Sequence, residues 1–311
     1  MTFSASHCFR YSRLSTFVKL MAVAPLYLLS QQAFSAVIVD GGIGSGKLDV
    51  GPGTAAQEYI ARNNATLNVT TGAVVKRLQA TTGSTLNVTA ATVTSADSTQ
   101  PAISLSNSTA TISNSQVTSH NNGGLNVARQ VDTTTGSYAQ VNSSGITGAT
   151  YGANVTSHSV LELNNSVLTG KSREGLRLLG GSAIATGSEI TGATSGVRMG
   201  RDTLTASESP HLTLDGSRVI GLNGPAINVD GPITAEIDIL NGSTLNGQNG
   251  NMLELTGGGN ANMRVNNSAL AGNIQVGAGS ALDLSLDGAF MNGDVIKDRK
   301  STRLNSSHNS N

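Results

Sequence analysis

Acidic side chains on neighbouring repeats are the residues of this 311-residue chain that could best support chemistry. An enzyme that cleaves polysaccharides needs several carboxylates close together. Counted from the repeat described below, Asp238 and Asp283 occupy the same position, but Met263 stands there in the repeat between them, and Asp215 and Asp287 fall at other positions. Serine-hydrolase phrases such as G-x-S-x-G do not occur in the sequence. We therefore expect no catalytic residues and no enzymatic activity.

Two other patterns could mark a nucleotide site or a metal site. Residues 41–47 (GGIGSGK) match the glycine and lysine positions of a phosphate-binding loop, but Leu48 stands where Ser or Thr would hold the metal, and no helical pattern follows. His120, His158 and His211 fall at three different positions of the repeat, so they would not stack into a metal site. We expect a glycine-rich turn and solvated histidines, with neither a cofactor nor a metal.

The first 35 residues have the features of a secretory signal peptide. Residues 1–19 carry three basic residues and no acidic residue, and residues 20–29 form an apolar run. This run is shorter than the roughly 20 residues that a membrane-spanning helix needs. We expect cleavage after Ser35, with Ala36 as the next choice, and export to the cell surface, the outer membrane or the medium.

Removal of this segment leaves a mildly acidic chain without cysteine. Residues 36–296 hold 12 Lys and Arg against 18 Asp and Glu, a net charge of −6, and the single cysteine, Cys8, lies in the signal segment. General nucleic-acid binding needs clustered basic residues, so we expect no nucleic-acid partner. A long exported chain without disulfides must be stabilised by repetitive packing instead.

A repeat of roughly 24 residues runs through the mature chain, and such repeats indicate a solenoid. Its best copies follow the pattern [N/G]-S-x-[V/I/L]-x-G, as in NNSVLTG at residues 164–170. Aligned on the serine or its substitute, the copies have these anchors: Gly72, Ala91, Ser115, Ser144, Ser166, Ser188, Ser217, Ser243, Ser268 and Gly288.

Three apolar stripes and one glycine column support this alignment. Two residues after the anchor every copy has an apolar residue, from Val74 to Phe290. Three residues before it all copies from Val69 through Leu240 to Val265 are apolar, and Ser285 is the exception. The third stripe consists of alternating phrases at residues 125–127, 176–178, 197–199, 227–229 and 253–255. Four residues after the anchor, glycine recurs at Gly148, Gly170, Gly192, Gly221, Gly247 and Gly272.

Short alternating runs of this kind predict three strands in each repeat. Gly, Asn and Ser at the corners supply positive φ and side-chain-to-backbone hydrogen bonds. We predict an all-β fold: a right-handed parallel β-helix of about ten coils over residues 61–296, preceded by an N-terminal cap at residues 36–60. A β-sandwich is the alternative, but its strands would not repeat with a 24-residue period.

The last fifteen residues break the pattern. Residues 297–311 (KDRKSTRLNSSHNSN) contain no apolar stripe, and residues 298–308 look like a translated sequencing adapter. A natural polar tail is the alternative. We expect residues 297–311 to be a non-native, unstructured tail, and the sequence to derive from a truncated gene, because native solenoids avoid an uncapped open edge.

A signal peptide followed by a cysteine-free β-helix rich in Gly, Ser, Thr and Asn resembles the passenger domains of Gram-negative autotransporters, particularly the pertactin-like passengers. The resemblance rests on the [N/G]-S-x-[V/I/L]-x-G phrases and covers about residues 61–296. It implies type V secretion through a C-terminal β-barrel in the outer membrane. No segment of this sequence resembles barrel strands, so the resemblance implies a passenger whose translocator is missing.

Two repeats are longer than the others and mark insertions at residues 128–138 and 200–211. Insertions in a solenoid form loops, and loops carry recognition. The second insertion places four charged residues close together in sequence: Arg198, Arg201, Asp202 and Glu208. This pattern predicts a contact for a polar partner, such as a host glycan or matrix protein. A solvated loop without a ligand is the competing interpretation for either insertion alone.

The sequence as a whole therefore predicts a surface-exposed or secreted, non-enzymatic adhesive or structural protein. The alternatives are a β-helix enzyme that acts on polysaccharides and a secreted solenoid without a translocator.

Overall fold

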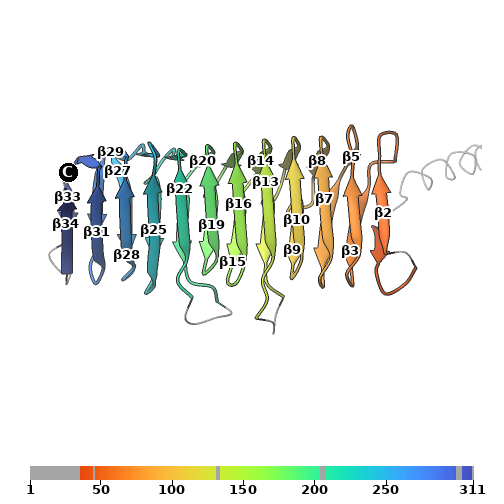
Figure 1. The fold of residues 1–311 in the computed structure, drawn as a ribbon, viewed down its shortest axis with the longest axis horizontal. Helices are drawn as coiled ribbons and strands as arrows, with labels where there is room; N and C mark the ends of the chain where they lie inside the picture. The colour runs from red at the N-terminus through yellow and green to blue at the C-terminus, as the bar shows by residue number, and fades with distance from the viewer. Residues whose placement is uncertain (1–35, 45, 131–133, 204–207, 299–302, 310–311) are drawn as a thin grey trace, which may run out of the picture. The chain divides into compact units, whose positions relative to one another are not determined.

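The structure is a computed structural model and describes residues 36–44, 46–130, 134–203, 208–298 and 303–309, the last range by its backbone alone. The predicted signal segment, residues 1–35, lies outside the described residues. From Ala36 onward the chain forms a parallel β-solenoid of about 11 turns, and the described ranges contain strands and turns but no helix (Figure 1). This confirms the predicted parallel β-helix.

Two long sheets, named sheet A and sheet B here, run along the solenoid with 12 parallel strands each. The strands of sheet A are β1 (Val37–Asp40), β3 (Glu58–Arg62), β6 (Arg77–Thr81), β9 (Ile103–Ser106), β12 (Leu125–Ala128), β15 (Ala153–Thr156), β18 (Leu176–Leu179), β21 (Val197–Gly200), β24 (Ile227–Asp230), β27 (Asn251–Thr256), β30 (Asn273–Val276) and β33 (Val295–Lys297). The strands of sheet B are β2 (Lys47–Val50), β4 (Thr66–Val69), β7 (Thr85–Thr89), β10 (Thr109–Ser113), β13 (Tyr138–Asn142), β16 (Val160–Asn164), β19 (Ser182–Thr186), β22 (His211–Asp215), β25 (Thr234–Leu240), β28 (Asn260–Asn266), β31 (Ala281–Asp287) and β34 (Arg303–Asn309).

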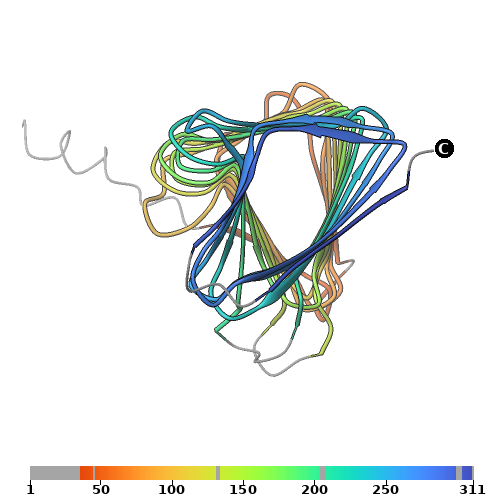
Figure 2. The same cartoon turned by 90° about the vertical axis from the view of Figure 1, so that its left-hand side faces the viewer.

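A third sheet, sheet C, closes the solenoid with eight strands, and the three sheets surround the interior (Figure 2). Its strands are β5 (Val74–Val75), β8 (Thr92–Ser95), β11 (Gln116–Ser119), β14 (Gly145–Gly148), β17 (Val167–Gly170), β20 (Glu189–Gly192), β23 (Arg218–Gly221) and β26 (Thr244–Gly247). A separate two-stranded sheet contains β29 (Ala269–Ala271) and β32 (Phe290–Asn292).

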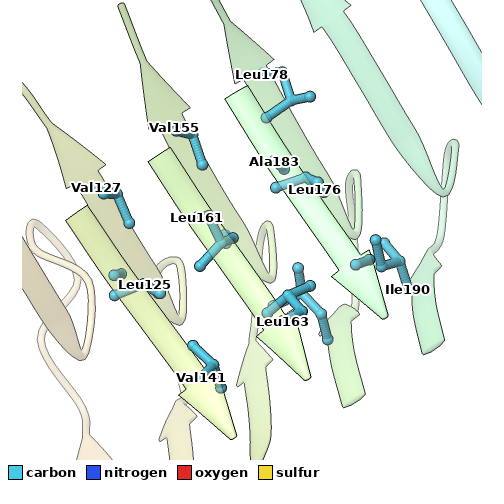
Figure 3. Packing of buried hydrophobic residues seen from close by; sticks show 14 of the residues in the cluster. Leu125, Val127, Val141, Val155, Leu161, Leu163, Leu176, Leu178, Ala183 and Ile190 are labelled. Carbon is cyan, nitrogen blue, oxygen red and sulfur yellow. The ribbon is translucent and has the colours of Figure 1, made fainter. Parts of the chain in front are cut away.

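The core consists of aliphatic columns, because equivalent residues of successive coils pair directly. Figure 3 shows Val155 and Leu178 of sheet A and Leu163 of sheet B among the side chains that fill the interior. One inward column of sheet B is apolar from β2 to β31: Val50, Val69, Val88, Ile112, Val141, Leu163, Ala185, Leu214, Ile239, Val265 and Leu286. Small aliphatic side chains can stack in this way without gaps, which explains the scarcity of aromatic residues.

The sequence alignment is wrong by one residue at three corners. Asn241 and Gly242 both have positive φ (52° and 78°) before Ser243. This corner, like the one at Gly72, therefore has one more residue than the other serine corners, and Ile239, rather than Leu240, faces the core. At Gly72 and Gly288 the aligned residue is itself the positive-φ residue of the corner.

These shifts change which residues belong to the apolar stripes. Val75 and Met291 therefore take the inward positions assigned to Val74 and Phe290, which are 51% and 63% exposed. Leu286 likewise replaces Ser285 in the sheet B column, so the one exception in that stripe disappears.

A ladder of buried serines explains why the repeat carries Asn-Ser or Gly-Ser at the corner between sheets B and C. The residue before the serine has positive φ, as in Asn165 (49°) and Gly187 (57°). Each serine Oγ then accepts a backbone N–H from the preceding coil: Ser115 from Ala91, Ser144 from Ser115, Ser166 from Ser144, Ser188 from Ser166, Ser217 from Ser188, Ser243 from Ser217 and Ser268 from Gly242. The corner sequence thus satisfies backbone groups that would otherwise be buried without a partner.

Both ends of the solenoid extend beyond the predicted coils. Strands β1 and β2, within the segment interpreted as a cap, pair with β3 and β4 and form a coil of their own, which raises the number of turns from ten to about 11. Lys297 is the last residue of β33, and Arg303–Asn309 form β34, parallel to β31, so the prediction that residues 297–311 are unstructured is wrong for these eight residues. Without β34, the backbone N–H and C=O groups at the edge of β31 would be unpaired. Such groups can form hydrogen bonds with a strand of any sequence, which explains why this polar segment pairs there.

Candidate functional site

The two predicted insertions leave the solenoid at the same corner. One connects β12 to β13 and the other connects β21 to β22, so both join sheet A to sheet B. Figure 1 shows both connections extending from the same edge of the solenoid, with the coils of β15 and β18 between them. Parts of the insertions, residues 131–133 and 204–207, lie outside the described residues.

The turn between β15 and β16 lies between the two insertions, and the second insertion binds it with two carboxylates. Glu208 Oε2 accepts the backbone N–H of His158 at 2.9 Å, and Glu208 Oε1 lies 2.7 Å from His158 Nδ1. Asp202, which is buried, accepts the backbone N–H of Ser157 at 3.4 Å. The second insertion therefore reaches back over one whole coil to contact this turn.

The first insertion contacts the same turn from the other side. The backbone N–H of Arg129 donates to Thr156 Oγ1 at 3.3 Å, and that of Ser137 donates to Ser159 Oγ at 3.1 Å. Gly136 has no room for a side chain, because a Cβ there would lie 2.0 Å from the carbonyl oxygen of His158. We name this region the two-loop corner: Arg129, Gly136, residues 156–159, Asp202 and Glu208.

The structure brings two of the four predicted contact residues together and places the other two elsewhere. Asp202 and Glu208 belong to the two-loop corner, where both hold the loop on the turn. Arg201 is exposed beside Asp202. Arg198 lies on β21 and forms an ion pair of 2.7 Å with Asp230 of β24, in the opposite direction along the solenoid. The sequence analysis grouped these residues because their numbers are close. In the structure, Asp202 and Glu208 contact an earlier coil, whereas Arg198 contacts the following one.

The predicted relation between the carboxylates of sheet B is wrong. Asp238 pairs in register with Thr213 and Arg264, whereas Asp283 pairs with Asn262 of the neighbouring column. The extra residue at the corner before Ser243 and the one-residue shift at Gly288 together produce this difference. Asp238 and Asp283 therefore do not share a position on successive coils.

The side chains around Asp238 do not form a nucleophile relay. Asp238 Oδ2 lies 2.9 Å from His211 Nε2, and Thr213 Oγ1 lies 3.4 Å from the same nitrogen. In a relay, the nucleophile and the orienting carboxylate contact opposite nitrogens of the imidazole ring. Arg264 also approaches Asp238 at 3.7 Å, which makes this group an ion-pair cluster.

Tyr138 and Glu162 form a polar pair on sheet B that the sequence analysis did not identify. The Tyr138 hydroxyl donates to Glu162 Oε2 at 2.7 Å, and Gln140 Nε2 donates to the same oxygen at 3.3 Å. Partial burial, followed by the hydrogen bond to Glu162 and its negative charge, raises the pKa of Tyr138 to about 12. The two residues occupy different columns of adjacent coils, so only the exact register could reveal the pair.

Tyr138 should make the protein less stable in strong alkali. The folded protein holds the phenolic proton more tightly than the unfolded chain, whose tyrosines titrate near pH 10. The free energy of unfolding should therefore fall as the pH rises from about 10 to about 12, where Tyr138 itself ionises. Phenolate absorbance during alkaline titration measures the pKa, and Tyr138→Phe identifies the transition. Glu162→Gln should move it back toward 10, and an identical curve in that variant would contradict the assignment.

The residues considered for a nucleotide site or a metal site do not come together in the structure. Residues 41–44 form the turn after β1, and Lys47 is the first residue of β2. His120 follows β11, far in the coil from His158 and His211. Across the described ranges no three His, Cys, Asp or Glu side chains come together in a way that could hold a metal ion.

Comparisons of the chain with protein-family models, with curated proteins and with solved structures gave no match. The described part of the chain also has no helix of the length and apolar character needed to cross a membrane.

Proposed function

We propose that this chain is an exported, autotransporter-like passenger that acts as a non-enzymatic adhesive protein at the cell surface. In this proposal the β-solenoid is a scaffold, and the two-loop corner contacts a polar partner such as a host glycan or a matrix protein. The signal-like residues 1–35 and the pertactin-like repeat support the export part of the proposal.

The convergence of both insertions on one turn is the observation that carries the proposal. Outside the insertions, the strands of successive coils pair residue by residue, as in the apolar column of sheet B. Irregular loops on a regular scaffold are where recognition usually lies. The second insertion passes over one coil to reach the turn at His158, and the first insertion contacts the same turn from the adjacent coil.

The chemistry of the corner suits a polar partner. The His158 and Glu208 side chains remain 34% and 27% exposed although they pair with each other. Arg201 and Thr203, on either side of Asp202 in the sequence, are exposed. An exposed ion pair contributes at most about 1 kcal/mol to stability, so its groups can exchange partners with a ligand at low cost.

Glu208→Gln should reduce attachment of the purified protein to host cells or matrix by roughly tenfold. The substitution removes the charge that holds the second loop on the turn, while an exposed pair of this kind adds about 1 kcal/mol or less to stability. The measurement is a binding curve of labelled protein on cells or matrix-coated wells, together with a thermal melt to verify folding.

Glu189→Gln provides the matched control, because Glu189 forms a comparable exposed ion pair, 3.6 Å from Arg218, on sheet C. Equal attachment of the wild type, Glu208→Gln and Glu189→Gln would contradict a role of the two-loop corner. The polysaccharide-active alternative is tested by incubating the intact protein with polysaccharides, since release of oligosaccharides would replace the adhesive proposal with an enzymatic one.

A further inference from the structure

Two arginines lie opposite each other on the outer face of sheet A. Arg177 of β18 pairs in register with Arg198 of β21, an arrangement in which like charges repel. Asp230 offsets the charge of Arg198 at 2.7 Å. Arg177 has no such partner: no hydrogen bond or ion pair joins it to another described residue, and its Nε is buried. The positive charge of Arg177 therefore takes part in no ion pair within the described residues.

A specific support holds the Arg177 side chain in place. Its guanidinium lies 4.7 Å from the centroid of the Tyr151 ring. The ring in turn packs on Gly123, where a Cβ would lie 2.1 Å from a ring carbon. Glycine, tyrosine and arginine thus stack over three successive coils. A cation placed on an aromatic face is held in a fixed orientation, which reduces the entropy lost when it binds a ligand.

Several buried side-chain atoms without a hydrogen-bond partner belong to residues within three positions of Tyr151 or Arg177 in the sequence. Four of the seven buried side-chain atoms without a hydrogen-bond partner in the described residues are Thr150 Oγ1, Asn154 Oδ1, Glu174 Oε2 and Arg177 Nε. Buried polar groups are normally paired, so such a concentration requires an explanation.

The charges near Arg177 favour an anion. Arg173 is half-exposed, and its Nε lies 3.5 Å from Glu174 Oε2. Burial lowers the pKa of Arg177, and the charges of Arg173 and Arg198 lower it further, against the opposing effects of Glu174 and Tyr151. Glu174 and Asp230 offset two of the three arginines, so one positive charge remains in excess around Arg177, while Glu254 lies in the same column two coils beyond Arg198.

Amide side chains flank the arginines along the same column. Asn126 and Asn154 precede Arg177 on the two previous coils, and Asn228 follows Arg198 on the next. Asn154 Nδ2 donates to Asn126 Oδ1 at 2.8 Å. Amides donate and accept hydrogen bonds as sugar hydroxyls require, and guanidinium groups bind carboxylates and sulfates through two parallel hydrogen bonds. The coils repeat at about 4.8 Å, so an extended polymer along the solenoid would meet these groups in succession.

We propose that this outer strip of sheet A binds an acidic polysaccharide. Arg177 and Arg173 contact its carboxylate or sulfate groups, and the partly exposed Asn126 and Asn228 contact its hydroxyls. We name the strip the Arg177 site: Asn126, Tyr151, Asn154, Arg173, Arg177, Arg198 and Asn228. It is distinct from the two-loop corner and does not depend on the adhesive function proposed there.

Isothermal titration of the full chain with three oligosaccharides tests the proposal: a sulfated heparin fragment, a carboxylated oligogalacturonate and a neutral dextran. One or both acidic oligosaccharides should bind and the dextran should not, and the one that binds more tightly identifies the acidic group. Arg177→Gln should weaken this binding about tenfold or more, because a charge-assisted contact is lost. Arg177→Lys should recover only part of it, since lysine lacks the planar fork.

Arg173→Gln provides a second variant if Arg177→Gln folds poorly, because the Arg173 side chain is 51% exposed. Arg264→Gln, whose side chain is 70% exposed on sheet B, is the matched control and should bind as the wild type does. Glu208→Gln should also keep full affinity, so failure of this proposal is distinguishable from failure of the adhesive one. Absent binding of both acidic oligosaccharides, unchanged binding by Arg177→Gln and Arg173→Gln, or equally tight binding of a polyglutamate peptide would overturn the proposal.

Discussion

Gly192→Ala should destabilise the solenoid by at least about 3 kcal/mol, more than an ordinary overpacked core substitution. A Cβ at Gly192 would lie 1.9 Å from the carbonyl oxygen of Ser195 and 2.3 Å from the backbone nitrogen of Gly175. Both are backbone atoms within the stacked coils, so no side chain can rotate away to make room. The measurement is urea unfolding followed by circular dichroism, with the midpoint of the variant well below that of the wild type.

The same collision recurs along the glycine column of sheet C. A Cβ would meet a backbone carbonyl at 1.9–2.0 Å at each of these positions: Gly148, Gly170, Gly192, Gly221 and Gly247. The chain has to turn sharply from sheet C toward sheet A at this point, and the turn passes directly over the glycine. The turn therefore excludes a side chain in these five coils, but not at Gly272, where the nearest atom would lie 3.2 Å away, nor on the two earlier coils with Ser95 and Ser119 in this column.

Gly51→Ala is the matched control for this prediction. Its nearest neighbour would be Thr70 Oγ1 at 3.6 Å, an ordinary contact, and its φ is not positive. This variant should unfold within about 0.5 kcal/mol of the wild type or be slightly more stable, because alanine loses less backbone entropy than glycine. Similar midpoints for Gly51→Ala and Gly192→Ala would show that the coil can shift to admit a methyl group.

Leu178→Ala should cost about 2–5 kcal/mol, the range for removing a fully buried leucine side chain. Leu178 is fully buried and stacks between Val155 and Met199 on the neighbouring strands of sheet A (Figure 3). The coils are held at the spacing of the parallel strands, so they cannot close over the missing atoms, and a cavity remains. Urea unfolding measures the loss, and the slope of the transition should stay unchanged.

Leu222→Ala is the control for the leucine substitution. Leu222 is 42% exposed in a turn after β23, so its truncation should change the free energy of unfolding by no more than about 0.5 kcal/mol. If Leu178→Ala were no more destabilising than Leu222→Ala, the aliphatic columns would not be the main source of stability. Because the chain after residue 35 contains no cysteine, no disulfide could replace them.

The residues that stabilise the solenoid differ from those of the two proposed recognition sites. Columns of leucine, valine and isoleucine and the serine ladder occupy the interior and its corners. The two-loop corner and the Arg177 site both lie outside these columns, on an insertion and on outward-facing strand positions. Substitutions at Glu208 or Arg173 can therefore test recognition while the scaffold stays folded.

The sequence by itself was sufficient to predict the parallel β-solenoid. The alternation within short runs, the stripes at a 24-residue period and the Asn-Ser or Gly-Ser corners are local features, and each is required by the sterics of one coil. Because every coil imposes the same requirement, the pattern can be recognised by comparing ten copies, although each copy departs from it at some position. The position of the insertions followed in the same way, since they are the places where the spacing lengthens.

Only the tertiary structure decided how residues of different coils meet. One additional residue at the corner of Asn241 and Gly242 was enough to exchange Leu240 for Ile239 in the core and to separate Asp238 from Asp283. In a strand, a shift of one residue turns every side chain to the other face, so the sequence period alone cannot fix the register.

The candidate sites depend on such contacts between coils. Asp202 and Glu208 meet Ser157 and His158, which lie 45 and 50 residues earlier in the chain. The stack of Gly123, Tyr151 and Arg177 similarly draws one residue from each of three coils. The repeat pattern predicts neither group of contacts. The second insertion passes over one coil, and the side chains of Tyr151 and Arg177 each reach the preceding coil, and neither feature recurs with the sequence period. Their positions are determined by the path of the chain in space.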